Sequence, residues 1–201
     1  MSRIITIGRQ FGSGGRELGR RLAQELKIEY YDREILGRIA EDTAFAEEYI
    51  QNVLERQPHN LLPITVGRSF ADAENYAFHQ AQSVYQSQSR ILHELAEKTD
   101  CVIIGRCADY ILRDLKPLRI FVYADDDSRV RRCMEHRREE EVDVSEKQML
   151  RRIHSMDRER TRYYDFYTGL KWGDKCNYDL CVNTSGKSIK ELVPAIAKLF
   201  D

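Results

Sequence analysis

Three closely spaced glycines near the amino terminus form the pattern that most clearly predicts a chemistry. The apolar run Ile4–Ile7 leads into a turn that contains Gly12, Gly14 and Gly15, and a helical pattern follows. Such a turn exposes backbone N–H groups, and the positive end of the helix dipole attracts an anion to the same spot. Glycine exposes these groups without a Cβ in the way. The pattern predicts a phosphate site, with a tight structural turn as the alternative.

The turn has the length of a phosphate-binding loop (P-loop) but lacks the lysine of that motif. In G-x-x-x-x-G-K-[ST], the lysine reaches the β- and γ-phosphates and the hydroxyl binds Mg²⁺. A gap-free match places Arg9 at the first glycine, Ser13 on the inner turn and Gly15 at the lysine. We therefore expect a guanidinium, from Arg16 or Arg9, to supply the missing cation.

Glu17 leaves two further alternatives open. Its carboxylate could bind Mg²⁺, or it could repel a phosphate. A dinucleotide-binding fold also fits in part, because residues 12–17 nearly match G-x-G-x-x-G and Asp32 lies about where a ribose-binding acid is expected. Glu17 occupies the third glycine position, however, where its side chain would block close packing of helix and strand. We therefore favour the P-loop interpretation.

The segment Tyr30–Arg38, which follows the first helical pattern, resembles the corresponding part of the cytidylate kinases. In those enzymes a Tyr-x-Asp segment follows the P-loop helix, and an arginine six residues later grips the monophosphate. Asp32 and Arg38 have that spacing. The resemblance implies that both residues bind the phosphate acceptor.

The apolar run before Gly105 resembles the next strand of the same enzymes, which ends in Asp-Gly-Arg-Asp. Gly105 and Arg106 match this ending, whereas Ile104 and Cys107 replace the two acids. In the family the acid and the arginine read the pyrimidine and its phosphate. Asp109, two residues further on, is the acid that could compensate.

An arginine-rich segment corresponds to the mobile lid of that family. From Arg129 to Arg162 there are ten arginines and one lysine. Charge spread over phosphoryl oxygens in a transition state needs fixed cations in a dry site. Aligned by length to the apolar run Leu180–Asn183, Arg158 and Arg162 match the two arginines of the family's return helix. An ordinary salt-bridged surface helix is the alternative for most of the other arginines.

Blocks at 8–17 (Gly-Arg-Gln-Phe-Gly-Ser-Gly-Gly-Arg-Glu), 30–34 (Tyr-Tyr-Asp-Arg-Glu) and 172–174 (Trp-Gly-Asp) resemble the cytidylate kinase-like family of bacteria. This resemblance covers essentially the whole chain. It implies transfer of a phosphoryl group from ATP, with Mg²⁺, to a nucleoside monophosphate, and CMP or dCMP is the first acceptor we expect. The candidate residues are Arg16, Arg158 and Arg162 for catalysis; Arg9, Gly12, Ser13, Gly14, Gly15 and Glu17 for nucleotide phosphate, with Glu17 also for Mg²⁺; and Asp32, Arg38, Arg106 and Asp109 for the acceptor.

Two other functions remain open. The missing lysine, the missing hydroxyl at Glu17 and the missing acid at Ile104 would suit a nucleotide-binding sensor or regulator without turnover. Changes in the acceptor pocket at Ile104 and Cys107 would instead suit a kinase for a non-nucleotide small molecule. Nucleotide binding without transfer, or transfer to another acceptor, would distinguish these functions from the first.

Short apolar runs separated by long helical patterns predict the fold. The runs at 3–7, 101–104, 118–123 and 180–183 are apolar enough for strands buried on both faces of a parallel sheet. Their alternation with helices predicts a doubly wound α/β sheet of the P-loop kinase type. Capping boxes at Ser145 with Gln148 and at Ser188 with Glu191 predict two helix starts.

One long helical pattern covers Asp72–Lys98; it would suit a homodimer surface, and packing of its apolar face on the core is the alternative. Pro58 and Pro63 in the loop before it predict a hinge. Its glutamines are predicted to lie on the polar side of the helix; they are Gln80, Gln82, Gln86 and Gln88.

The length of 201 residues predicts one domain. We expect a core of 1–32, 99–128 and 176–201, a helical acceptor-binding insertion at about 33–98, and a lid with its return helix at about 129–175.

Composition excludes several classes of function. A formal charge of −1 gives no global field for nucleic acid, so no nucleic-acid partner is expected. No apolar run approaches the roughly 18–20 residues that span a bilayer. Together with the absence of a signal-peptide pattern, this predicts a cytoplasmic protein. The five cysteines are scattered without a C-x-x-C pair, which predicts buried or incidental thiols rather than zinc ligands or disulfides.

Overall fold

The sheet is parallel throughout, and its central strand leads directly into the glycine turn. The computed structural model describes residues 3–32, 34–55, 68–136 and 144–200. It contains a five-stranded sheet with the order β2-β3-β1-β4-β5. The strands are β1 (Ile4–Arg9), β2 (Glu29–Tyr31), β3 (Cys101–Ile104), β4 (Leu118–Tyr123) and β5 (Leu180–Asn183).

Strand register places the carboxyl ends of β1, β3 and β4 at one edge of the sheet. Ile7 of β1 lies opposite Ile104 of β3, and Arg9 lies opposite Val122 of β4. The predicted runs at 101–104, 118–123 and 180–183 are confirmed, and β1 begins and ends slightly later than predicted. The three-residue β2 was not predicted, because it is short and begins with a charged residue.

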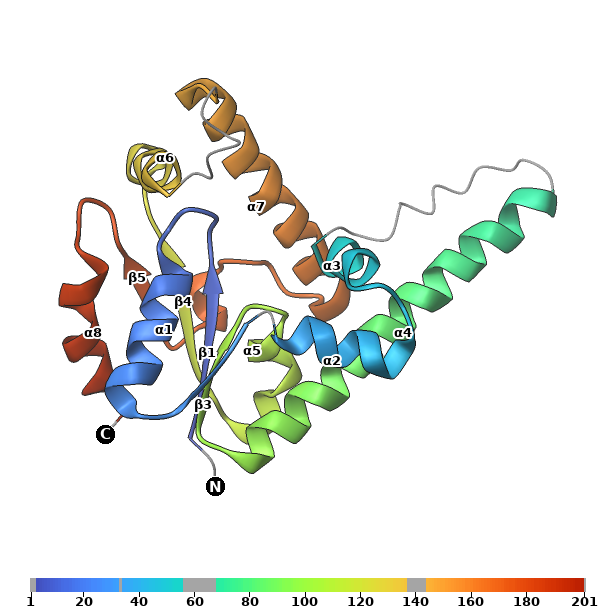
Figure 1. Ribbon diagram of the computed structural model, residues 1–201, viewed down its shortest axis with the longest axis horizontal. Helices are drawn as coiled ribbons and strands as arrows, with labels where there is room; N and C mark the ends of the chain where they lie inside the picture. The colour runs from blue at the N-terminus through green and yellow to red at the C-terminus, as the bar shows by residue number, and fades with distance from the viewer. Residues whose placement is uncertain (1–2, 33, 56–67, 137–143, 201) are drawn as a thin grey trace.

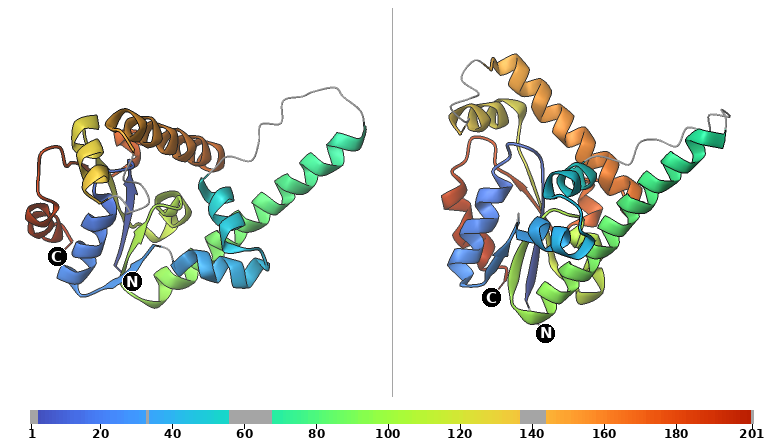
Figure 2. Two further views of the ribbon diagram at one scale, coloured as in Figure 1. Left: turned by 45° about the horizontal axis from the view of Figure 1, so that its top comes forward. Right: turned by 45° about the vertical axis from the view of Figure 1, so that its right-hand side comes forward.

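Helices cover both faces of the sheet, as Figures 1 and 2 show. On one face, α1 (Gly15–Leu26) and α8 (Ile189–Ala197) enclose a core with Ile5 and Ile7. On the other face, Ile4 and Ile103 pack with residues of α2 (Glu34–Thr43), α4 (Arg68–Lys98) and α5 (Ala108–Ile111). The doubly wound arrangement that the sequence predicts is therefore confirmed.

Two further helices lie beyond the carboxyl edge of the sheet. In Figure 1, α6 (Asp126–Glu135) and α7 (Glu146–Thr168) lie at the end towards which β1 points. The other helical elements are α3 (Glu47–Glu55), η1 (Arg113–Leu115) and η3 (Lys175–Asn177).

The two predicted capping boxes have different outcomes. At α7, Ser145 Oγ accepts a hydrogen bond from the Gln148 N–H, and the Gln148 side chain accepts one from the Ser145 N–H, so this box is confirmed. At α8 the predicted helix start is confirmed, with Ser188 as the N-cap residue, but the capping box is absent because the Ser188 side chain makes no capping bond. The backbone carbonyl of Ser188 accepts from the Glu191 N–H at 3.2 Å, which already satisfies the donor.

The long helix α4 begins at Arg68, four residues before the predicted start, and its amino-terminal half extends away from the sheet (Figure 1). The predicted polar side is wrong for Gln88, whose side chain is fully buried. The predicted hinge at Pro58 and Pro63 lies outside the described residues.

Among the described residues, no helix is both long enough and apolar enough to cross a bilayer. All five cysteines are free, which agrees with the expectation that they form no disulfide.

Candidate active site

The predicted glycine turn is present between β1 and α1. Gly12 (φ +76°) and Gly14 (φ +79°) are in the left-handed region, and α1 begins at Gly15. A Cβ on Gly12 would press on Cys133 and on the Arg129 backbone, and a Cβ on Gly14 would collide with Ile189. Glycine is therefore required here both for the backbone angle and for the close approach of neighbouring elements.

Several N–H groups of the turn are available to a ligand. The first bond of α1 runs from the Leu18 N–H to the Gly14 carbonyl at 2.9 Å. The N–H groups of Gly12, Gly14 and Gly15 have no acceptor among the residues that the structure describes. These donors and the positive end of α1 together favour an anion.

Arg9, at the start of the loop, is close enough to three other arginines and one carboxylate for their charges to act on it. Burial is the main cause that lowers the pKa of Arg9 well below its usual value, and the positive charge of Arg160 acts in the same direction. Arg106 and Arg16 lower it further, whereas Asp32 opposes the shift. Like charges held this close repel one another, and a polyanion would offset that repulsion. The loop and its arginines therefore have the charge and the donors of a phosphate site.

A strained turn after β3 brings Arg106 into this group. Gly105, Arg106 and Cys107 all have positive φ, at +64°, +61° and +52°. A non-glycine residue in this region costs about 1–2 kcal/mol, and such strain is concentrated at functional sites. A Cβ on Gly105 would collide with the Arg9 guanidinium, which lies directly against it. The Arg106 carbonyl accepts from Gln88 Nε2 at 2.9 Å.

Arg16, predicted to replace the lysine, is held by Asp32. Arg16 Nε lies 2.5 Å from Asp32 Oδ2, and Arg16 Nη2 lies 3.4 Å from Oδ1. The Asp32 side chain is 7% exposed and that of Arg16 is 53% exposed. The pair therefore joins a predicted phosphate-binding residue to a predicted acceptor-binding residue at one site.

Glu17 was predicted as a candidate Mg²⁺ ligand, and its neighbours do not favour that role. Its carboxylate pairs with Arg21 Nε at 2.7 Å, one turn along α1. Within the described ranges no cluster of three or more acidic, histidine or cysteine side chains could hold a metal ion. A site completed by phosphate oxygens and water needs no such cluster, so the role of Glu17 as a Mg²⁺ ligand stays a prediction.

The structure does not place Arg38 or Asp109 with the arginines of the loop. Arg38 Nη2 lies 3.6 Å from Glu94 Oε2, and Glu94 also pairs with Arg90 at 2.7 Å. Asp109 is buried and accepts from the Tyr164 hydroxyl at 2.6 Å. Burial is the main cause that raises the pKa of Asp109. Neither residue is among the four charged groups with the largest effect on the pKa of Arg9.

From α7 the loop is contacted by Arg160, which the sequence analysis did not select. Arg160 Nη1 donates to the Arg9 carbonyl at 3.1 Å, and its guanidinium lies 5.4 Å from the centre of the Phe11 ring. Arg158 and Arg162 are exposed. They are four residues apart and share one side of the helix, whereas Arg160 lies about 200° away from Arg158 around the axis.

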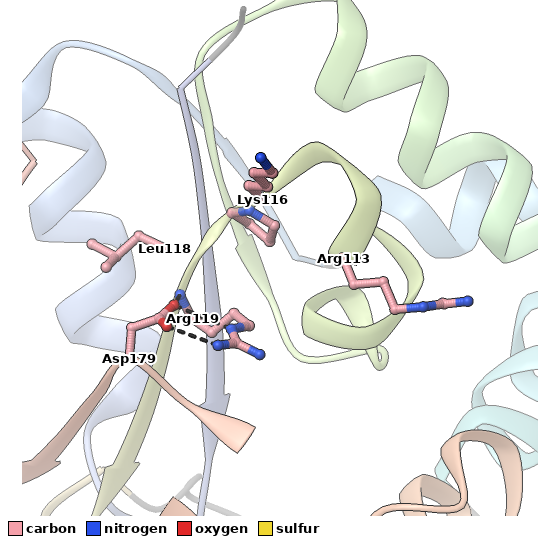
Figure 3. A pocket seen from close by; sticks show the side chains of 6 residues that line it. Arg113, Lys116, Leu118, Arg119 and Asp179 are labelled. Carbon is pink, nitrogen blue, oxygen red and sulfur yellow. Dashed lines mark hydrogen bonds and ion pairs between the residues drawn. The ribbon is translucent and has the colours of Figure 1, made fainter. Parts of the chain in front are cut away.

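An open pocket of about 470 Å³ lies at the opposite edge of the sheet (Figure 3). Arg113, Lys116 and Arg119 line it, and Asp179 pairs with Arg119 Nη2 at 2.8 Å. It is located at the amino ends of β4 and β5. Because ligands of open parallel sheets bind at the carboxyl ends, this pocket is separate from the candidate site.

The parallel sheet, the glycine loop at the carboxyl end of β1 and the helices on both faces are the features of the P-loop kinase fold. Solved structures agree with this fold. A shikimate kinase from Bacteroides thetaiotaomicron has a TM-score of 0.57 at 15% identity, over 98% of this chain and 97% of that one. A shikimate kinase from Acinetobacter baumannii in complex with shikimate has a TM-score of 0.53 at 14% identity, over 99% and 92%.

The chain belongs to the cytidylate kinase-like family, whose model matches residues 4–186. An uncharacterized protein from Eubacterium ventriosum ATCC 27560 has a similar structure, with a TM-score of 0.71 at 28% identity over 100% of this chain and 99% of that one. No curated protein matches the sequence. The predicted family and fold are thus both confirmed, and phosphoryl transfer is the chemistry that they support.

Proposed function

We propose that this protein transfers a phosphoryl group from ATP to a nucleoside monophosphate, with CMP or dCMP as the first acceptor to test. Family membership and the kinase fold support the reaction class. The observation that carries the proposal is the group of four arginines, Arg9, Arg16, Arg106 and Arg160, around a glycine loop with free N–H groups. Such a site suits two phosphate-bearing ligands better than one small anion, because several cations are available at once.

Catalysis in this proposal consists of positioning and charge neutralisation, without a covalent intermediate. N–H groups of the glycine loop hold the donor phosphates. Arg9 and Arg16 supply the positive charge that the missing lysine would supply, and Arg160 adds a cation from α7. Arg106, at the end of the neighbouring strand, binds the acceptor phosphate. Fixed guanidinium groups stabilise the charge on the transferring group most effectively where water is excluded.

The remaining predicted residues have less support from their positions. Asp32 orients Arg16 through the two-point ion pair. Exposed Arg158 and Arg162 remain candidates for the closed lid, and Arg38 remains a candidate for the acceptor. Mg²⁺ enters this proposal with the nucleotide, because phosphate oxygens and water are its usual ligands where carboxylates are few.

Transfer to a non-nucleotide small molecule is the second candidate function. It is favoured by the acceptor side of the site, where Ile104 and Cys107 replace the two acids of cytidylate kinases and are buried. Arg38 also pairs with Glu94 instead of joining the arginines of the loop. Both features weaken the match to a pyrimidine monophosphate pocket.

A coupled ADP-release assay tests the proposal. It would contain ATP, Mg²⁺ and a panel of nucleoside monophosphates that includes CMP and dCMP, with shikimate and simple sugars as non-nucleotide acceptors. We expect turnover with a monophosphate. Turnover with a non-nucleotide acceptor alone would support the second candidate. ATP binding by calorimetry without any turnover would contradict both and favour a nucleotide sensor.

A further inference from the structure

We propose that Asp157 and Arg129 are positioning residues that fix the phosphate loop from the two helices beyond it. Neither residue is among the glycines and arginines of the site described above, although Asp157 Oδ1 lies 3.9 Å from Arg160 Nη1. The inference rests on the proposed function in one respect, namely that the loop binds phosphate. Its structural part, the fixing of the loop, can be tested without any nucleotide.

Both residues bond to the same residue of the loop, Phe11. The Phe11 N–H donates to Asp157 Oδ1 at 2.8 Å, and the Phe11 carbonyl accepts from Arg129 Nε at 2.8 Å. Arg129 Nη2 also pairs with Asp157 Oδ2. Phe11 is thereby held on its N–H and its carbonyl by one ion pair.

The pair is itself rigidly placed. The Arg129 side chain is 3% exposed and that of Asp157 is 14% exposed. Arg129 Nη1 donates to Asp126 Oδ1 at 3.1 Å, and the other oxygen of Asp126 bonds to His154 Nε2 at 2.9 Å. Breaking a buried ion pair leaves an uncompensated charge and is strongly unfavourable. The pair is therefore a stable anchor for a loop that glycines would otherwise leave free.

The anchor matters for anion binding because it sets the direction of a peptide carbonyl. The hydrogen bond from Arg129 Nε keeps the Phe11 carbonyl pointing towards the Arg129 guanidinium. Without that bond, the loop could rotate and turn a carbonyl towards the ligand, where it would repel a phosphate. The neighbouring N–H groups of Gly12 and Gly14 keep their orientation only while the peptides next to them are fixed.

The same contacts couple the loop to the helices. Arg129 lies on α6 and Asp157 on α7, so Phe11 is the point at which the two helices and the loop meet. Arg160, one turn beyond Asp157 on α7, donates to the Arg9 carbonyl. A shift of α7 would therefore change the shape of the loop. We infer that the positions of these helices control how well the loop binds phosphate.

A purely structural role for the pair, tying α6 to α7, is the alternative, and a matched control separates the two. Asp179 also accepts a backbone N–H at 2.8 Å and pairs with an arginine, Arg119, at the opposite edge of the sheet. Asp179→Ala thus removes the same kinds of bond far from the loop, from a pair that is more exposed than Arg129 and Asp157.

Hydrogen–deuterium exchange in the full chain tests the fixing of the loop, read at the two amides of the loop segment that have backbone acceptors, Gln10 and Ser13. We expect Asp157→Ala to raise exchange in this segment by at least about tenfold, because local opening becomes easier there. Asp157→Asn, which keeps an oxygen for the Phe11 N–H, should have a smaller effect of about threefold, and Asp179→Ala should stay within about twofold of the natural protein. Exchange in Asp157→Asn and Asp157→Ala that matches the Asp179 control would overturn the proposal. If Asp157→Ala does not fold, the comparison of Asp157→Asn with Asp179→Asn decides the question.

ATP binding by calorimetry tests the consequence for phosphate. Where the natural protein binds ATP, Asp157→Ala should weaken the affinity at least about tenfold while Asp179→Ala leaves it unchanged, because only the first loses oriented donors. Equal affinities in these two variants would overturn the link to phosphate. Loss of loop protection in Asp157→Ala together with no ATP binding by the natural protein would contradict the proposed function and leave the fixing of the loop supported.

Discussion

Gly105 offers a direct test of whether the position of Arg9 matters for anion binding. A Cβ at this residue would collide with the Arg9 guanidinium, and φ is +64°. Gly186 is a matched control, because its φ is +61° and no atom lies within 4 Å of an added Cβ. The two glycines thus share the backbone conformation and differ in what their side chains would meet.

The expected magnitudes follow from these two environments. Alanine at positive φ costs about 1–2 kcal/mol, and the lower entropy of the unfolded chain offsets about 0.4–1 kcal/mol of that. Both variants should therefore lose about 1 kcal/mol of unfolding free energy, or about 2–4 °C in Tm. The atom that collides at Gly105 is the end of a flexible side chain, so Arg9 moves aside without much additional destabilisation. The displaced guanidinium loses its bond to the ligand, and a charge-assisted hydrogen bond is worth about 1.5–3 kcal/mol.

Calorimetric titration with ATP measures the difference between the variants. We expect Gly105→Ala to bind ATP about 10- to 100-fold more weakly than the natural protein, given the loss of one such bond. Gly186→Ala should bind as the natural protein does. Equal ATP affinities in the two alanine variants would refute the reasoning, because Arg9 would then have no role that depends on its position against Gly105.

Three other predictions concern catalysis, pH and helix capping. Arg16→Ala should lower kcat/KM by at least about 30-fold, or ~2 kcal/mol, as when one fixed donor is removed. Unchanged turnover would contradict the role, with Arg20→Ala, at an exposed position of the same helix, as the control. Burial raises the pKa of Asp109, so the folded protein holds this proton more tightly than the unfolded chain does. The unfolding free energy of the natural protein should therefore fall, relative to that of Asp109→Asn, as pH rises from about 4 through the raised pKa. Urea titrations of both proteins between pH 4 and 8 would measure this. A difference in unfolding free energy that does not change with pH would be evidence against it. Ser145→Ala should destabilise the protein by about 1 kcal/mol in thermal unfolding, and Ser188→Ala by much less. The reason is that, of these two serines, Ser145 alone caps its helix with its side chain. Equal losses of unfolding free energy in the two variants would contradict this assignment.

The sequence was most predictive where the pattern was local. Apolar runs located β3, β4 and β5, and the glycine spacing located the phosphate loop, because both signals depend on neighbouring residues alone. The capping box predicted at Ser145 and Gln148 was confirmed for the same reason. Ser188 has the same spacing to Glu191, but its backbone carbonyl takes the bond instead.

The orientation of the polar part of α7 was harder to predict. Residues 154–162 contain one apolar residue, Met156, so the local pattern does not show which arginine faces the loop. The signal that could have found Arg160 is more distant: Ile153 and Tyr164 are buried and lie on the same side of the helix. Arg160 faces the loop, whereas the resemblance pointed to Arg158 and Arg162. Gln88 is a similar case, since its burial depends on the Arg106 carbonyl from a separate element. Such contacts between distant elements require the three-dimensional structure.

The partners of the loop also determine when it can acquire its shape during protein synthesis. The loop at Phe11 and Ser13 leaves the ribosome early, but Phe11 bonds to Asp157 and the Ser13 carbonyl accepts from Thr184, more than 140 residues later in each case. A nascent chain that ends before α7 therefore contains the complete glycine motif without the groups that fix it. Anion binding should arise only after α7 and Thr184 have emerged, so that a growing chain with a recognisable nucleotide motif would not yet sequester ATP.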